Sequence, residues 1–346
     1  MLLYLALNLH MEVPSTMLTE KSLRDNPVLI KAFTGLPADA FWELVKKIGA
    51  ELPEYKRQRH ERPDRQRAVG GGRDFDQPVV IRVVQVLTYS RLHIPQEMVA
   101  LLFGGTQTDV SRDLRRLLPL ICRLLPAPEV WTAVEEGETL TQAEVLELVQ
   151  LADERALVDA TEQPVYRSQD NKVRKAYYSG KKKAFTLKTQ FVTDGEHHVV
   201  AISEAVPGAK HDKKLSDAVK TVERLPDECE ANADKGYQGL ADQVTLVTVR
   251  NAETGEEQQV PRLTVHTPIK KPKGQELTDE QKAFNHQLGA IRVRVEHCIG
   301  WVKNWGIIAT RFRCAHSIYT LVMQVVCGLV NWQTQRWQVA KAAAVA

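Results

Sequence analysis

The sequence is poor in cysteine, and its cysteines are not paired at the spacing of a metal site. None forms a CxxC pair, and they are scattered along the chain: Cys122, Cys229, Cys298, Cys314 and Cys327. An odd, dispersed set argues against a disulfide framework and against a zinc knuckle. We therefore expect a protein of the reducing cytoplasm.

The sequence also lacks a long apolar run. The first nine residues are apolar, but a membrane span needs about 20 residues, and no basic lead or clear cleavage site marks a signal peptide. Met11 and Met17 are alternative starts. Apolar residues make up 43% and charged residues 26%, which excludes wholesale disorder and fibrous repeats. We expect no membrane partner.

The excess of positive charge is small, at +3, but the cations are clustered, and clusters decide phosphate binding. At 346 residues, the chain exceeds the roughly 100 to 200 residues of one domain, so we expect two units. A helical pattern over 38–48 precedes a basic stretch, 56–73, that we interpret as a linker.

Three apolar helical patterns follow, over 78–91, 95–103 and about 107–121, with a turn at Gly104 and Gly105 before the third. The third buries Val110, Leu114, Leu117 and Ile121. This order suits a helix-turn-helix module, and a plain helical bundle is the alternative. The polar side of the third helix carries the candidate DNA contacts Gln107, Thr108, Ser111, Arg112, Arg115 and Arg116. A capping box predicts a further helix over 141–153.

From Arg155 onward the pattern becomes mixed α/β. Strands are predicted over 156–160, 185–193, 198–203 and 229–233, with a helical segment over 211–224. The Asp194-Gly195 pair indicates a hairpin. A polar stretch over 250–259 leads to an apolar segment, 264–269, and then to a long helix that begins at the Thr278 and Gln281 capping box. The apolar helix over 317–331 is core or an oligomer interface.

Three acids are the candidate catalytic residues. Asp159 and Asp234 each close an apolar run, so we expect both at strand ends, and Glu296 lies on the long helix with Arg292 and Lys303 on the same face. Carboxylates suit Mg²⁺ or Mn²⁺, and two such ions support phosphoryl transfer, with the two cations neutralising phosphates. Helix-capping acids and a routine surface ion pair are the simpler interpretation of the spacing alone.

Six ordered blocks favour the catalytic interpretation: VDATEQPV at 158, KAYYSGKKK at 175, TLKTQ at 186, PGAKHDKK at 207, ADKGYQG at 233 and RVRVEH at 292. Together they resemble the bacterial insertion sequence five family of DDE transposases, over roughly 75–335. The resemblance implies a ribonuclease-H-like α/β domain with the three acids as metal ligands, preceded by an all-α helix-turn-helix domain. Gly289 stands where related transposases carry Tyr, and we expect it to mark either a bend in the helix or close packing against DNA.

Further basic and aromatic residues are candidate DNA contacts, with a solvated loop as the alternative. Those between the first two acids are Lys172, Arg174, Lys175, Tyr177, Tyr178, Lys181, Lys182, Lys183 and Lys188. Lys270, Lys271 and Lys273 form another cluster. His211 and Asp212 are candidate supports behind the acids; a surface histidine and a helix-terminal acid are the plainer readings.

The expected function is a transposase that binds terminal inverted repeats, cuts DNA with water and joins the free 3′-hydroxyl to target DNA. Double-stranded DNA, a homodimer or higher oligomer, and nucleoid association are the expected partners and location. The alternatives are an endonuclease that does not join strands and a domesticated DNA-binding protein. The expected divisions are 1–73 helical segment and linker, 74–153 helix-turn-helix domain, 154–335 catalytic domain and 336–346 tail.

Overall fold

The computed structural model describes residues 18–61, 77–135, 137–141, 149–250 and 256–345. The chain forms two compact units, one made of Met1–Leu124 with Trp305–Ile307 and the other of Leu125–Asn304 with Ile308–Ala346. The division thus falls earlier than the expected 153/154 boundary. The reason is a short strand, β1 (Glu129–Trp131), that pairs in parallel with a strand of the second unit.

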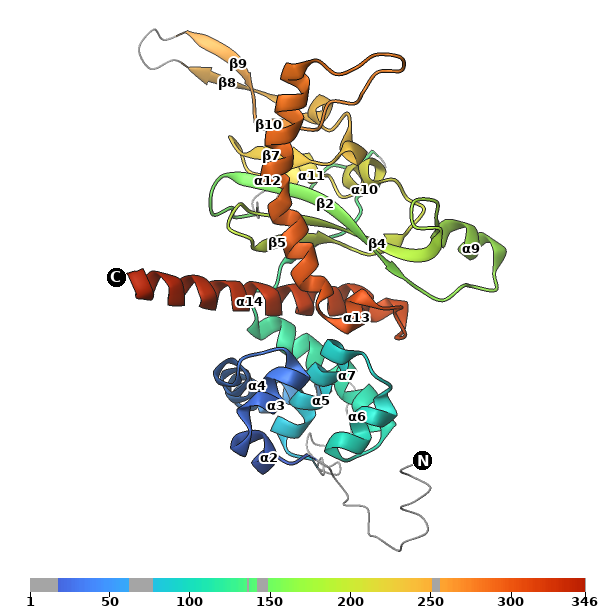
Figure 1. Cartoon of the computed structure of the whole chain (residues 1–346), viewed down its shortest axis with the longest axis vertical. Helices are drawn as coiled ribbons and strands as arrows, with labels where there is room; N and C mark the ends of the chain where they lie inside the picture. Colours follow the sequence, from blue (N-terminus) through green and yellow to red (C-terminus); the bar gives the residue numbers. More distant parts are fainter. Residues whose placement is uncertain (1–17, 62–76, 136, 142–148, 251–255, 346) are drawn as a thin grey trace, which may run out of the picture. The chain divides into compact units, whose positions relative to one another are not determined.

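The first unit is all α. Its helices in the described residues are α2 (Glu20–Asp25), α3 (Pro27–Thr34), α4 (Ala38–His60), α5 (Val79–Leu92), α6 (Gln96–Phe103) and α7 (Gln107–Leu124). The three predicted helical patterns are confirmed as α5, α6 and α7 (Figure 1). The predicted linker was wrong at its start, because α4 runs on to His60; residues 62–73 lie outside the described part.

Helix α5 is the centre of the first unit. It contacts α3, α4, α6 and α7, and most of its side chains are buried. Arg82 of α5 and Asp113 of α7 form a bidentate ion pair in which both side chains are 3% exposed. The turn before α7 needs glycine, since Gly104 and Gly105 have φ of +82° and +95°. The predicted apolar face of α7 is buried, as expected.

The second unit contains a mixed sheet in the order β1-β5-β4-β2-β7-β10. Its main strands are β2 (Arg155–Pro164), β4 (Ala184–Thr193), β5 (Val199–Ser203), β7 (Glu230–Ala233) and β10 (Thr264–His266), with β3 (Tyr178–Ser179) and β6 (Val206–Pro207) paired to β4. Neighbours β5, β4 and β2 are antiparallel, whereas β7 pairs in parallel with both β2 and β10. This mixed sheet is consistent with the ribonuclease-H-like layout that the resemblance implies.

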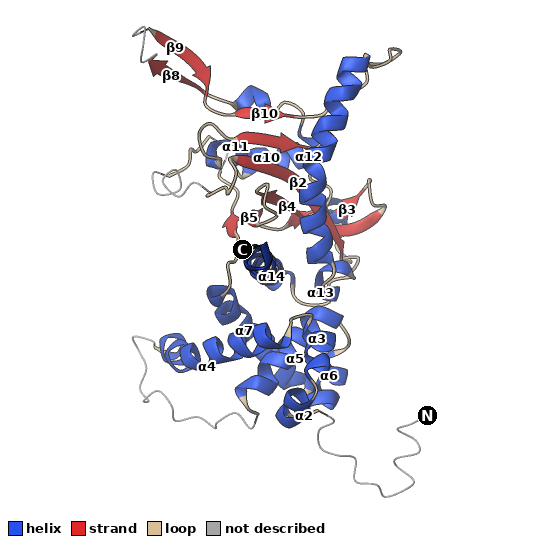
Figure 2. Ribbon diagram, turned by 60° about the vertical axis from the view of Figure 1, so that its left-hand side comes forward, coloured by secondary structure: helices blue, strands red, loops and turns tan. Residues whose placement is uncertain are grey.

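Helices cover both faces of this sheet. On one face α10 (Asp212–Ala218) and α11 (Thr221–Arg224) pack their apolar side chains with Ala156 and Val158 of β2 and with Ala231 and Ala233 of β7. The long helix α12 (Asp279–Lys303) crosses β2, β4 and β7, and α14 (Tyr319–Val345) contacts β5 and β1 (Figures 1 and 2). Side chains alternate along a strand, so Asp159 lies on the opposite side of β2 from Val158.

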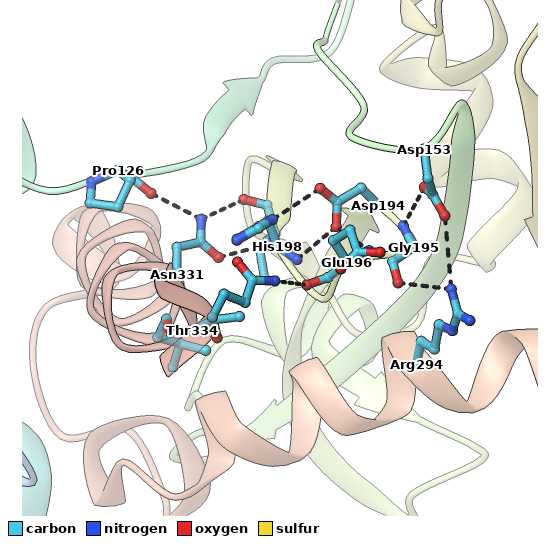
Figure 3. A network of polar contacts seen from close by, with 12 residues as sticks. Pro126, Asp153, Asp194, Gly195, Glu196, His198, Arg294, Asn331 and Thr334 are labelled. Atoms are coloured by element: carbon cyan, nitrogen blue, oxygen red, sulfur yellow. Dashed lines mark hydrogen bonds and ion pairs between the residues drawn. The ribbon is translucent and has the colours of Figure 1, made fainter. Parts of the chain in front are cut away.

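The β4–β5 hairpin fixes α12 and α14 against the sheet (Figure 3). Gly195 donates its N–H to Asp153 Oδ1 at 2.8 Å and accepts from Arg294 Nη1 of α12 at 2.8 Å. Asn331 of α14 accepts from Val199 N and donates to its carbonyl, each at 2.8 Å. The predicted hairpin is confirmed, and it holds α12 two residues from Arg292.

Several local predictions were wrong. Residues 149–153 are not helical, whereas 142–148 of that predicted helix lie outside the described part. The two ends of the stretch expected as a polar connection, 250–259, lie in the paired strands β8 (Leu246–Arg250) and β9 (Glu257–Pro261), and its residues 251–255 lie outside the described part. The expected tail continues α14 to Val345. None of the helices in the described ranges is long and apolar enough to cross a bilayer.

Candidate active site

The first two predicted acids are neighbours because of the strand register. Val158 of β2 pairs in parallel with Ala233 of β7, and Asp159 and Asp234 are the next residue of each strand. Asp234 leaves β7 as the N-cap of a 3₁₀ turn, η1 (Lys235–Tyr237). Asp159 does not end its strand as predicted: β2 continues to Pro164, and Asp159 pairs with Phe191 of β4.

Arg292 of α12 lies between these two carboxylates. Its Nη1 is 3.1 Å from Asp234 Oδ1, and its Nη2 is 3.9 Å from Asp159 Oδ2. The Arg292 side chain is 10% exposed, against 22% for Asp159 and 33% for Asp234. Its Nε has no hydrogen-bond partner among the described residues. The guanidinium thus serves as a shared, largely buried cation for the acid pair.

The surroundings disfavour negative charge. Burial above all, with smaller contributions from the charges of Asp234 and Asp212, raises the pKa of Asp159 from 3.8 to about 6, against the lowering effects of the Ala160 N–H and Arg292. Complete burial, followed by the charges of these acids, raises the pKa of the Tyr237 hydroxyl well above its usual value. That hydroxyl has no partner in the described residues. A strongly shifted carboxyl beside a second acid is typical of an active site.

The third predicted acid does not join the first two in this conformation. Glu296 is exposed on α12, one turn after Arg292, and makes no ion pair within the described residues. No group of three or more His, Cys, Asp or Glu side chains in those residues is arranged to hold a metal. Asp159 and Asp234 nevertheless fit a hard divalent cation, since their carboxylates already surround one positive group.

A second buried ion network supports the loop that carries Asp234. Lys188 of β4 donates to Asp212 Oδ1 at 2.7 Å and to the Lys210 carbonyl at 2.6 Å, and it lies 3.6 Å from Glu162, its cross-strand neighbour on β2. Asp212 begins α10 and packs against Gly236 of η1, where an added Cβ would lie 2.7 Å from Asp212 Oδ2. Lys188 is therefore an internal cation and not the exposed DNA contact that the sequence predicted.

The remaining predicted contacts are largely on the surface. On α7, Gln107, Thr108, Arg112 and Arg115 are exposed, and Ser111 and Arg116 are half-buried. Helix α9 (Asn171–Tyr177) and the turn before β4 expose Lys172, Lys175, Tyr178, Lys181, Lys182 and Lys183, while Arg174 and Tyr177 are half-buried and Tyr177 stacks on His316. Lys270, Lys271, Lys273 and His211 are exposed.

Lys303 is exposed at the end of α12, within electrostatic reach of Asp159 and Glu162. Gly289 has open space around its Cβ position, so close packing within the described chain does not explain it. The sequence interpretation missed Glu162 and Tyr237. Both lie in the quoted blocks, within three residues of an acid, and that proximity was the available signal.

Comparison with known proteins supplies the family. The model of the DDE superfamily endonuclease family matches residues 158–331, and the chain belongs to this family. It is 32% identical over 191 residues to the probable transposase for insertion sequence element IS702 of Microchaete diplosiphon. The matched region covers 54% of this chain and 60% of that relative. The chain thus matches about three fifths of that relative's length. No solved structure matches the chain.

Proposed function

We propose that this protein is a DNA transposase that cuts DNA at the ends of an insertion sequence. The observation that carries the proposal is the pairing of Asp159 and Asp234 around one cation, in a chain of the DDE endonuclease family. Its relative is named a probable transposase, which supports the same activity here. The domain around the acids is proposed to be ribonuclease-H-like.

Members of this family generally use divalent metal ions, and we propose Mg²⁺ or Mn²⁺, two per site, for this chain. Asp159 and Asp234 would hold an ion, and Glu296 would complete the set after α12 adjusts. A bound ion would supply activation of an attacking oxygen and stabilisation of a leaving oxygen. The chain itself supplies position and charge, because phosphoryl transfer needs no protein nucleophile. Lys303, exposed beside the acids, would neutralise a substrate phosphate.

DNA recognition is assigned to surfaces outside the acid pair. The exposed side of α7 is proposed to contact base edges of terminal inverted repeats, as the second helix of a helix-turn-helix does. The α9 region, with Lys175, Tyr178 and Lys181–Lys183, and the Lys270–Lys273 loop are proposed to follow the phosphate backbone. These exposed lysines are accessible to a phosphate, whereas the buried Lys188 is already engaged with Asp212 and the Lys210 carbonyl.

Strand transfer and oligomeric assembly extend the proposal. After cleavage, the free 3′-hydroxyl would attack target DNA at the same centre, and a homodimer or higher oligomer would bring two ends together near the nucleoid. An endonuclease that does not join strands is the second candidate. It is favoured by the family description, which names cleavage alone.

The test uses purified full-length protein and DNA carrying the ends of its own element. The strands are scored as nicked, excised or joined, with Mg²⁺ or with EDTA, for the wild type and for Asp159→Asn, Asp234→Asn and Glu296→Gln. We expect metal-dependent cleavage and joining, with each variant losing more than the ~10- to 100-fold that follows loss of a group that only supports a ligand. Cleavage without joining would favour the endonuclease; binding without cleavage would favour a domesticated DNA-binding protein.

A further inference from the structure

We propose that Arg292 is the resident counter-ion of the acid pair in the metal-free protein, and that it must leave this position when a divalent cation binds. The inference rests on the proposed metal-dependent function. Its basis is that two different nitrogens of one guanidinium face the two acids, Nη1 toward Asp234 and Nη2 toward Asp159. Arg292 is thereby a positioning residue for the acids, in addition to its expected role with phosphate.

The acid pair needs such a counter-ion. The parallel register makes Asp159 and Asp234 neighbours, and their side chains are only 22% and 33% exposed. Two adjacent carboxylates in a poorly solvated site repel each other unless a cation lies between them. Lys188 is already engaged with Asp212 and the Lys210 carbonyl, and Lys303 is exposed at the helix end. In the described part of the chain, Arg292 is the cation that forms ion pairs with both acids.

The same oxygens are the ones a metal would use. Mg²⁺ binds carboxylate oxygens at about 2.0 to 2.1 Å, so an ion between Asp159 Oδ2 and Asp234 Oδ1 would take the space of the guanidinium and repel its charge. Arg292 Nε has no partner among the described residues, so few bonds hold the side chain besides the two ion pairs. Metal and guanidinium therefore compete for one position.

Competition predicts a coupling between metal and DNA. A planar guanidinium that leaves the acids matches the oxygens of a phosphate. A DNA phosphate that draws Arg292 away would remove the competitor and strengthen metal binding, and metal would strengthen DNA binding by the same factor. Without Arg292 this coupling should largely disappear. A purely structural arginine would not produce it.

The experiment measures Mn²⁺ affinity of the full-length protein by electron paramagnetic resonance, with and without element-end DNA in which cleavage is blocked. The variants are Arg292→Gln, Arg292→Lys and Lys303→Gln; the last removes a charge near Asp159 without emptying the position between the acids. We expect Arg292→Gln to bind Mn²⁺ about tenfold or more tighter, within the ~5- to 150-fold range of typical couplings. Arg292→Lys should be intermediate, and Lys303→Gln should change affinity at most a few-fold.

Two further readouts keep the test decisive. In EDTA, Arg292→Gln should unfold at a lower temperature than the wild type, and Mn²⁺ should raise its unfolding temperature by more. If Arg292→Gln does not fold, the affinity of Arg292→Lys decides the question. The proposal is overturned if neither variant binds Mn²⁺ more tightly than the wild type, or if Lys303→Gln gains as much. Absence of Mn²⁺ binding in every protein, or binding that survives Asp159→Asn, would instead overturn the proposed function.

Discussion

Replacing Lys188 by methionine tests whether its ammonium group balances buried carboxylates or contacts DNA. Its side chain is 8% exposed, and the Glu162 and Asp212 side chains beside it are also largely buried. Methionine keeps the length of the side chain but removes the charge. The two carboxylates would then lose their shared counter-ion in a poorly solvated position.

The magnitude follows from the burial. Removing one partner of a buried ion pair costs about 3 to 5 kcal/mol, because the other charge stays buried and unpaired. For a unit of this size, 1 kcal/mol corresponds to about 2 to 4 °C, so the unfolding temperature of the second unit should fall by about 6 to 20 °C. Calorimetry in EDTA measures this fall, and Asp212→Asn combined with Lys188→Met should recover part of it.

Lys183→Met is the matched control, since Lys183 is exposed in the turn before β4. Lys183→Met should leave the unfolding temperature unchanged. Loss of a phosphate contact there should reduce the slope of log K for DNA binding against log salt concentration by about one. The reasoning is refuted if Lys188→Met unfolds like the wild type and instead shows that reduced salt dependence.

Two further outcomes follow from single contacts. The hydrogen bond to Asp194 raises the pKa of His198 above 6.5 against partial burial, so protonated His198 stabilises the fold. The unfolding free energy lost in His198→Gln should be largest below pH 6.5 and should shrink as the pH rises through the pKa of His198 in the folded protein. Urea unfolding of both proteins across this pH range measures the loss. A loss that does not change with pH would contradict the reasoning. Gly236→Ala should impair cleavage, because the added Cβ would force the Asp212 carboxylate away. Gly289→Ala has open space at its Cβ, so this variant should cleave DNA normally and gain up to about 1 kcal/mol of stability.

Local signals predicted those features that depend on neighbouring residues in sequence. The Thr278 and Gln281 capping box begins α12 in the structure, as expected. The Asp194-Gly195 pair correctly marked the turn between two antiparallel strands, although the positive φ of that turn is at His197 (+68°), and the Asp194 carboxylate accepts from the N–H groups of Glu196 and His198. The spacing of apolar residues in α7 identified its buried face, since an α-helix repeats about every 3.6 residues.

Features set by distant contacts were not predictable in this way. The short apolar run before Asp159 predicted a strand that ended at Ala160, but β2 continues to Pro164, and Thr161 and Gln163 are buried. Lys188 belongs to a charge-rich stretch, and only its register opposite Glu162 shows that it is internal. Arg292 was expected beside Glu296 on its own helix, whereas packing of α12 on β2 and β7 directs it to the acids.

The β8–β9 hairpin shows the same limit. Both strands are exposed over most of their length, and β9, Glu257-Gln-Gln-Val-Pro, shows no alternation of apolar and polar residues that would mark it in the sequence. Likewise β1 has three residues, and its pairing with β5 depends on a partner about 70 positions further along the chain.

The most direct test of the account compares wild type and Asp234→Asn on DNA that carries the element's ends, in Mg²⁺ and in EDTA. The account predicts cleavage by the wild type in Mg²⁺ alone and none by the variant, which should still bind the DNA. Normal cleavage by Asp234→Asn, or cleavage by the wild type in EDTA, would contradict it.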